Sequence, residues 1–286
     1  MEQDINEVKN FWEANPLWVG ESKFKPGTFE FFEEHRQTVI DDCFAGKLDS
    51  RIFPKIEKNQ KILDLGCGIG FWTVELLLKG YTNVMAADLT RNALTLTEKR
   101  LSAYGVIAEL SIQNAENMTF KNSEFSHVNC LGVIHHSPNP ESCIKEIARV
   151  LGAKGTACIS VYYKNFFLRI WPLLKYPARI IMRILGGGLK GRGRENIFFI
   201  DDVNEIVRLY DGDKNPIGRA YSKREFFDML RPYFEIKDHF YHFFPARALP
   251  FKLPRFVHSL LDRFCGFMIF VVIQKRDRIL SHDPST

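Results

Sequence analysis

A short glycine-rich stretch between a strand and a helix constrains this chain more than any other part of its sequence. The stretch reads Asp64-Leu65-Gly66-Cys67-Gly68-Ile69-Gly70. The apolar run over 61–67 predicts a buried strand that ends in it, and the pattern over 71–79 predicts the helix that follows. Glycine lets the backbone turn tightly and approach a ligand without a Cβ in the way, and the helix presents free N–H groups at its first turn. The stretch therefore predicts a ligand site at the carboxyl end of a parallel strand.

Apolar runs and helical patterns continue to alternate as far as Tyr163. Strands strictly alternating with helices favour a parallel sheet that is covered on both faces. Thr90 is the predicted N-cap of the second helix. The later predicted strands cover 83–88, 106–113, 125–133 and 156–163, and the helices between them cover 92–104 and 141–151.

The regions on either side of this core predict additions to the same sheet. About 60 residues precede it, rich in aromatic side chains and partly helical in pattern, and we expect them to cap one edge of the sheet. Downstream, Ser222 and Glu225 form a capping-box pattern that predicts a helix over 222–230. Apolar runs over 234–244 and 265–274 predict an antiparallel pair of strands at one sheet edge, with a helix over 250–264 between them.

The glycine stretch can be compared with three known types of nucleotide-binding loop. The dinucleotide fingerprint needs a third glycine where this chain has Phe71, which disfavours a nicotinamide-dependent oxidoreductase. A phosphate loop of the G-x-x-x-x-G-K-[ST] type is also absent from the sequence. The acid-x-Gly-x-Gly-x-Gly pattern instead resembles the cofactor loop of class I S-adenosylmethionine-dependent methyltransferases. This resemblance implies an α/β, Rossmann-like, seven-stranded and mostly parallel sheet with helices on both faces and the last strand antiparallel.

The resemblance extends to segments after the later strands. Asp88 ends the second strand, where an acid of this family accepts hydrogen bonds from both ribose hydroxyls, as a carboxylate is able to do. Asn114-Ala115-Glu116 resembles the adenine-binding segment, although Asn114 replaces the aspartate that is frequent there. The resemblance thus implies S-adenosylmethionine as cofactor. No cluster of carboxylates and histidines in the sequence suggests a metal, so none is expected. The implied cofactor contacts are Asp64, Gly66, Cys67, Gly68, Gly70, Asp88, Leu89, Asn114, Ala115, Glu116 and Leu131.

The acceptor side of the predicted site depends on aromatic and imidazole groups. His135 and His136 follow the fourth strand, where a histidine can take a proton from an acceptor hydroxyl or amine; alternatively, both only pack beneath the cofactor. Tyr162 and Tyr163 end the fifth strand and either line the acceptor pocket or lie at the sheet rim. Trp12 and Trp18 are expected to form a lid that excludes water, or else to be helix core.

The positive charge is concentrated in one segment. The chain has a net charge of +5, and 164–194 holds eight Lys or Arg and no Asp or Glu. This segment is interpreted first as a substrate flap or packed insert, second as a peripheral membrane contact, and last as a nucleic-acid surface, so no nucleic-acid partner is expected. The sequence Asp211-Gly212-Asp213-Lys214-Asn215-Pro216 lacks most ligand positions of a calcium loop and is interpreted as a turn.

The sequence as a whole predicts a methyltransferase for a small molecule. We expect O-methylation of an apolar or aromatic metabolite, with N- or C-methylation and a non-catalytic binding module as alternatives. Scattered cysteines and an acidic start without an apolar core favour a cytoplasmic protein with reduced thiols. Four segments are predicted: a helical aromatic cap (1–57), a cofactor-binding core (58–163), a basic insert or flap (164–220) and a completion of the sheet (221–286).

Overall fold

One twisted sheet organises the protein in a computed structural model, which describes residues 4–184, 197–249 and 251–277. In these residues eight strands pair in the order β3-β2-β1-β4-β5-β8-β7, and the short β6 pairs with β5 outside this path. The strands are β1 (Ile62–Leu65), β2 (Val84–Asp88), β3 (Glu109–Ile112), β4 (Phe125–Leu131), β5 (Leu151–Tyr163), β6 (Ala220–Tyr221), β7 (Phe234–His242) and β8 (Met268–Lys275). Neighbouring strands are parallel except β8, which is antiparallel to both β5 and β7.

This topology confirms the expected fold class. The sheet is mostly parallel, its last strand is reversed, and β7 and β8 form the predicted antiparallel pair at one edge. The sheet has one strand more than the expected seven. The additional strand is β6, whose two residues Ala220 and Tyr221 are too few to produce a readable alternation in the sequence.

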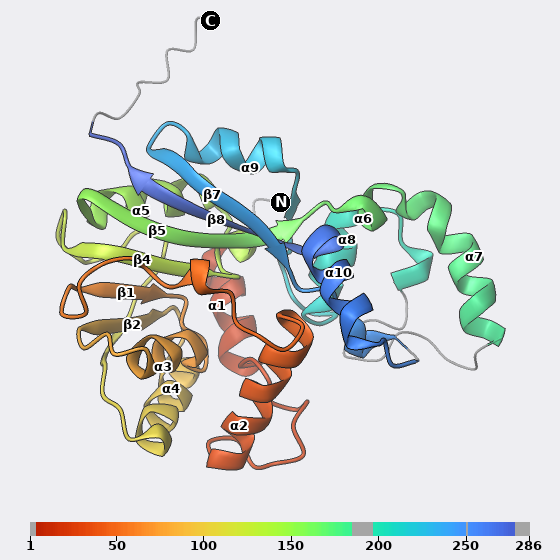
Figure 1. Cartoon of the computed structure of the whole chain (residues 1–286), viewed down its shortest axis with the longest axis horizontal. Helices are drawn as coiled ribbons and strands as arrows, with labels where there is room; N and C mark the ends of the chain where they lie inside the picture. Colours follow the sequence, from red (N-terminus) through yellow and green to blue (C-terminus); the bar gives the residue numbers. More distant parts are fainter. Residues whose placement is uncertain (1–3, 185–196, 250, 278–286) are drawn as a thin grey trace, which may run out of the picture.

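Helices cover both faces of the sheet, as Figure 1 shows. Helices α5 (Pro140–Val150) and α9 (Lys223–Leu230) lie on one face, while α3 (Phe71–Leu78) and α4 (Arg91–Tyr104) lie on the other. Successive strand residues point to opposite faces. Accordingly, Ala87 packs in the cluster that contains α5 and α9, and Ala86 packs against Leu94 of α4. The apolar clusters on the two faces of the sheet fix β1, and the glycine-rich loop follows at its carboxyl end.

The N-terminal region packs both on the helices beside the site and against the edge strand β7. Phe31 and Phe32 bury their rings against Ile69 and Leu96. Phe44 and Ile52 pack with Phe240 of β7, and Arg51 pairs with Asp238 of the same strand. Figure 1 shows these helices beside α3 and α4. The elements of this region are α1 (Ile5–Ala14), α2 (Phe29–Thr38), a π-helical turn (Val39–Cys43) and a 3-10 turn (Ser50–Ile52).

Thr90 is the N-cap of α4, as the sequence predicts, but the N–H groups of the first turn are satisfied by another residue. The side chain of Thr90 makes no cap hydrogen bond and its hydroxyl donates instead to Asp88. The carboxylate of Glu13, at the end of α1, accepts the N–H groups of Arg91 and Asn92 at 2.8 and 3.1 Å. The first turn of α4 is thereby satisfied by a residue from the N-terminal region.

The remaining helices gather at one end of the molecule, on the right of Figure 1. Helix α7 continues through Pro177. The basic residues Lys190, Arg192 and Arg194 lie outside the described residues. In the parts of the chain that the structure describes, none of the helices has the length and apolar character needed to cross a membrane. These elements are α6 (Phe166–Arg169), α7 (Trp171–Ile184), a 3-10 turn (Ile197–Phe199), α8 (Val203–Tyr210), a 3-10 turn (Ala246–Ala248) and α10 (Arg255–Cys265).

Candidate functional site

The glycine-rich loop is built so that only glycine fits at its critical positions. Gly66 has φ +70° and a Cβ there would collide with the side chain of Val133. Gly68 has φ +55°, also in the left-handed region, but a Cβ there would meet no protein atom within 4 Å. Gly66 thus allows close packing, whereas Gly68 keeps an open face toward the cavity beside it.

Asp88 ties this loop to the end of β2. One carboxylate oxygen accepts the N–H of Gly68 at 2.9 Å, and the other accepts the N–H and the hydroxyl of Thr90 at 2.9 and 2.8 Å. Burial raises the pKa of Asp88, although these hydrogen bonds act in the opposite direction. A carboxylate has about four acceptor positions, so Asp88 retains capacity for further O–H donors from a ligand.

Asp64 lies beneath the loop. Its side chain is buried and accepts the hydroxyl of Thr73 at 2.5 Å. Burial, together with the charge of Asp88, raises the pKa of Asp64 to about 7. Asp64 is not part of the cavity wall, and its expected contact with the cofactor stays a prediction.

The predicted adenine-binding segment lies in the cavity wall next to the loop. The side chain of Asn114 accepts the N–H of Glu116 at 3.0 Å and so holds a tight turn. Glu116 accepts the hydroxyl of Ser137 and the N–H of Asn139, which fastens the segment to the start of α5. Two loops that follow different strands are thus fixed to each other at one side of the cavity.

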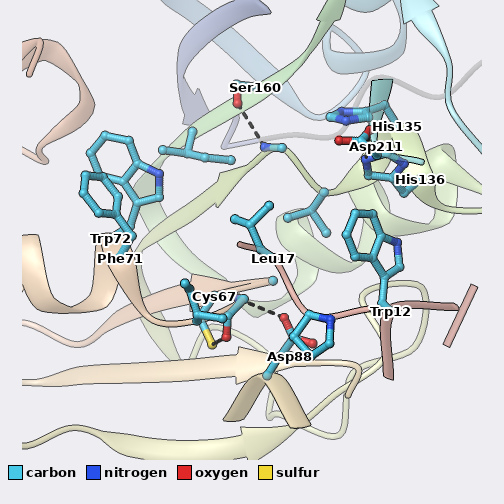
Figure 2. Close-up of a pocket in the computed structure, with 18 of the residues that line it drawn as sticks. Trp12, Leu17, Cys67, Phe71, Trp72, Asp88, His135, His136, Ser160 and Asp211 are labelled. Carbon is cyan, nitrogen blue, oxygen red and sulfur yellow. Dashed lines mark hydrogen bonds and ion pairs between the residues drawn. The ribbon is translucent and has the colours of Figure 1, made fainter. Parts of the chain in front are cut away.

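A second group of polar side chains meets in the wall of the same cavity. Nδ1 of His136 lies 2.7 Å from the carbonyl oxygen of Ile217, and its Nε2 lies 3.5 Å from a carboxylate oxygen of Asp211. The hydroxyl of Tyr162 donates to Asp211 at 3.0 Å. Trp12 meets the His136 ring edge-on, with ring centroids 5.2 Å apart. Figure 2 shows Trp12 between the histidine group and Asp88.

One cavity of about 390 Å³ joins these two groups. It brings together most of the residues that the sequence predicted. Gly70, which begins α3, and Tyr163, whose ring packs against Tyr241, are outside its wall. Tyr162 and Tyr163 are consecutive strand residues and point to opposite faces, so only one of them can reach the cavity. The predicted residues in the wall are Trp12, Trp18, Gly66, Cys67, Gly68, Asp88, Leu89, Asn114, Ala115, Glu116, Leu131, His135, His136 and Tyr162.

The two neighbouring histidines differ in their surroundings. His135 is almost fully buried, and its ring lies against those of His136 and Tyr162 with centroids 4.2 and 4.4 Å apart. Burial, with a smaller contribution from His136, lowers the pKa of His135 well below its usual range. His135 is therefore a neutral packing group near pH 7, whereas His136 has a hydrogen bond at Nδ1 and the carboxylate of Asp211 near Nε2.

Several cavity residues were not expected from the sequence. Asp211 lies in the segment interpreted as a turn, and only the fold of α8 brings it to His136. Phe71 and Trp72, at the start of α3, form an aromatic wall with ring centroids 4.8 Å apart. Figure 2 shows this pair across the cavity from His136. A run of aromatic residues directly after a ligand loop was the available signal for this wall.

Comparison with known proteins defines the class. Residues 63–159 match the family model of a methyltransferase domain. A ubiquinone biosynthesis O-methyltransferase of Azoarcus sp. (strain BH72) is 29% identical over 228 residues, which cover 77% of this chain and 91% of that protein. The enzyme of the same name from Hydrogenovibrio crunogenus is 29% identical over 59% of this chain and 66% of its own length.

Solved structures agree on the fold. A SAM-dependent methyltransferase of Methanosarcina mazei matches with a TM-score of 0.54 and 21% identity, over 79% of this chain and 95% of that one. A possible histamine N-methyltransferase of Thermotoga maritima matches with a TM-score of 0.53 and 16% identity, over 94% of this chain and all of that one. The core of the chain is therefore a methyltransferase domain with the class I fold. The protein is a methyltransferase whose cofactor is S-adenosylmethionine.

The residues in place fit this cofactor. Gly68 leaves the loop open toward the cavity, and the buried Asp88 carboxylate has acceptor capacity for hydroxyl donors. The cavity that begins at the loop extends to the aromatic wall and to His136. The cavity therefore offers an acceptor for ribose hydroxyls and apolar surface for the adenine ring of this cofactor.

Proposed function

We propose that this protein transfers a methyl group to a hydroxyl of a small, largely apolar or aromatic acceptor, with His136 as the general base. The observation that carries the proposal is the hydrogen bond between His136 Nδ1 and the carbonyl of Ile217. A backbone carbonyl only accepts, so Nδ1 carries the hydrogen and, in the neutral ring, Nε2 holds the lone pair. The basic nitrogen of His136 is thereby set on the side of Asp211.

Asp211 supports this role electrostatically. Its carboxylate lies 3.5 Å from Nε2 and is itself held by the hydroxyl of Tyr162. When His136 takes a proton from an acceptor hydroxyl, the positive imidazolium that forms faces a negative group in a largely buried site. Such an arrangement stabilises the protonated base and makes removal of the hydroxyl proton easier.

The cofactor residues follow from the same cavity. The proposed contacts are the ribose hydroxyls with Asp88, the loop backbone at Gly66 and Gly68, and the adenine with the segment from Asn114 to Glu116. When bound, S-adenosylmethionine supplies a methyl group already activated by a sulfonium, so the chain needs no covalent nucleophile. Its residues position the acceptor and exclude water, and good alignment accounts for up to roughly 7–11 kcal/mol of the barrier.

The shape and lining of the cavity support a small and mostly apolar acceptor. Trp12, Phe71 and Trp72 supply aromatic surface to the cavity wall. The wall also includes the charged residues Glu21, Asp42 and Arg247. The relatives from Azoarcus and Hydrogenovibrio are named as O-methyltransferases, which favours oxygen over nitrogen or carbon. The N-terminal helix α1 closes over this space, which favours a metabolite over a macromolecule.

A matched panel of acceptors tests the proposal. Hydroxylated aromatics with increasing apolar substitution are each paired with the corresponding aromatic amine and incubated with labelled S-adenosylmethionine. We expect label in the hydroxylated compounds only, at oxygen by NMR of the product, and a loss of turnover in His136→Asn. Label only in the amines, retained in His136→Asn, would replace the proposal by N-methylation of the neutral amine. Absence of label throughout the panel would overturn it.

A further inference from the structure

Helix α10 exposes a stripe of large apolar side chains to solvent and buries two polar ones. Phe256, Leu260 and Phe264 are 70%, 55% and 68% exposed, and their spacing of four residues places them on one stripe. His258 and Asp262 are buried, while Val257 and Leu261 are partly buried. The exposed apolar stripe and the buried polar pair partly reverse the pattern expected for a surface helix of a globular protein.

The inward polar residues hold α10 in this orientation. Asp262 accepts the N–H of Phe244 at 3.1 Å and lies 2.5 Å from Nδ1 of His242. Nε2 of His258 lies 3.1 Å from the carbonyl oxygen of Phe244. Turning the apolar stripe inward would break these contacts, so its exposure is fixed by the structure.

Helix α7 shows the same reversal. Leu173, Tyr176 and Ile180 are 76%, 58% and 63% exposed and follow one another at helical spacing. Lys175 on the inward side is buried and pairs with Asp201. Two helices with outward apolar stripes are unlike the scattered exposed apolar residues of an ordinary surface.

The two helices lie at the same end of the molecule. Figure 1 shows α7 and α10 together on the right, away from β1, β2 and β3. The side chain of Asn165, which caps α6, donates to the carbonyl of Cys265 at 2.6 Å. The exposed rings of Phe166 and Phe264 are the immediate neighbours of this bonded pair. The stripe on α10 and the segment that leads into α7 therefore adjoin.

The charge around these stripes is positive. The sequence from 164 to 194 contains no acid, and from 245 to 265 its single acid is Asp262, which faces inward. Arg263 lies beside the ring of Phe264, with its guanidinium 5.7 Å from the ring centroid. Arg255 pairs with Asp41 at 2.6 Å, and Arg179 lies over the ring of Phe199 at 4.3 Å. Exposed apolar groups edged by cations match the interface of a bilayer with anionic headgroups.

We propose that α7 and α10 form a docking surface for an anionic lipid bilayer. Their apolar stripes enter the headgroup region, and the cations beside them, including Lys252 and Arg263, contact the negative headgroups. The surface lies on elements that follow the catalytic core in sequence, so docking is separable from cofactor binding. Attachment is peripheral, through helices that lie along the interface.

Vesicle sedimentation of the full chain tests this proposal. The vesicles are phosphatidylcholine alone or with about 30 mol% phosphatidylglycerol, at low salt and at about 0.5 M salt. We expect binding to the anionic vesicles that is weakened by salt, and little binding to phosphatidylcholine alone. The variant Phe256→Ser/Leu260→Ser/Phe264→Ser is expected to bind at least about tenfold more weakly. Ile107→Ser, which removes an apolar side chain that is 87% exposed elsewhere, should bind like the wild type.

Two further measurements keep the result interpretable. Calorimetric titration with S-adenosylhomocysteine should give equal affinity for the wild type and the triple variant, which shows that the variant is folded. Light scattering without lipid should show the same mass for both. Equal binding to neutral and anionic vesicles, or unchanged binding of the triple variant, would overturn the proposal. The proposal would also be overturned if the wild type were a dimer and the triple variant a monomer, because the stripe would then be covered by a second copy of the chain.

Discussion

The carboxylate of Glu13 at the end of α1 accepts the backbone N–H of Arg91 at 2.8 Å, at the first turn of α4. This contact fastens the N-terminal region beside the cofactor loop, and the neighbouring Trp12 meets the ring of His136. The wall of the acceptor cavity therefore depends on a helix cap supplied from a distant part of the chain.

Removal of this cap should weaken both stability and acceptor binding. We expect Glu13→Ala to lower the free energy of unfolding by roughly 0.5–2 kcal/mol, because two N–H groups of α4 lose their acceptor. Acceptor KM should rise more than kcat falls, since Trp12 is displaced while the catalytic groups remain. Urea unfolding and steady-state kinetics measure the two effects. Glu7→Ala in the same helix is the control, and an equal effect of both variants would contradict this role of Glu13.

Asp88 should determine cofactor affinity. In Asp88→Asn the negative charge and one acceptor atom are lost next to Gly68, so we expect S-adenosylhomocysteine to bind at least about tenfold more weakly by calorimetry. Asp238→Asn, on β7, removes an exposed carboxylate and serves as the matched control. Unchanged affinity in Asp88→Asn would show that the ribose is held by other groups.

The parts of the site that were predictable are those encoded locally. The glycine loop, Asp88 and the histidine pair each directly follow a strand, and parallel strands bring their carboxyl ends to one edge of the sheet. Asp211 was missed because its turn becomes a cavity wall only after α8 packs beside β5. Thr90 was correctly predicted as the N-cap of α4, but the contribution of Glu13 was missed because an acid in the N-terminal region carries no local signal for it. The two-residue strand β6 was too short to detect. Which of Tyr162 and Tyr163 faces the cavity depends on the direction of alternate side chains along β5, and the sequence left this open.

His242 should make the stability fall as the pH rises. Its two ring nitrogens face Asp262 and Asp49 at 2.5 and 3.1 Å. Burial alone would lower the pKa of His242, but its hydrogen bonds to Asp262 and Asp49 raise it above 6.5. Because the pKa of His242 is higher in the folded than in the unfolded state, its protonation contributes fully to the free energy of unfolding below pH 6.5. This contribution is lost as the pH rises through the pKa of the folded state. Thermal unfolding of His242→Asn should lack this loss, while His239→Asn on the same strand should retain it. Parallel curves for the wild type and His242→Asn would contradict the assignment.

His127 should make the stability fall as the pH falls, which is the opposite of the effect of His242. Burial lowers its pKa to about 3, and Nδ1 lies 2.8 Å from the hydroxyl of Thr156. As the pH falls below about 6.5, His127 takes up a proton in the unfolded chain, whereas in the folded chain it stays neutral until about pH 3. The free energy of unfolding therefore decreases as the pH falls from about 6.5 toward 3. His127→Asn should be less stable at pH 7 but should lose less stability on acidification to about pH 5. Chemical unfolding at both pH values measures this difference, and an equal loss in the two proteins would count against it.

The rate of methyl transfer to a hydroxyl in His136→Asn tests the central claim most directly. Asparagine preserves a donor toward the carbonyl of Ile217 but removes the basic nitrogen next to Asp211. With a hydroxylated aromatic that the wild type methylates, we predict a fall in kcat/KM of roughly 10²–10⁴ and an unchanged affinity for S-adenosylhomocysteine. A variant that methylates the same hydroxyl at the wild-type rate would contradict the assignment of His136 as the base.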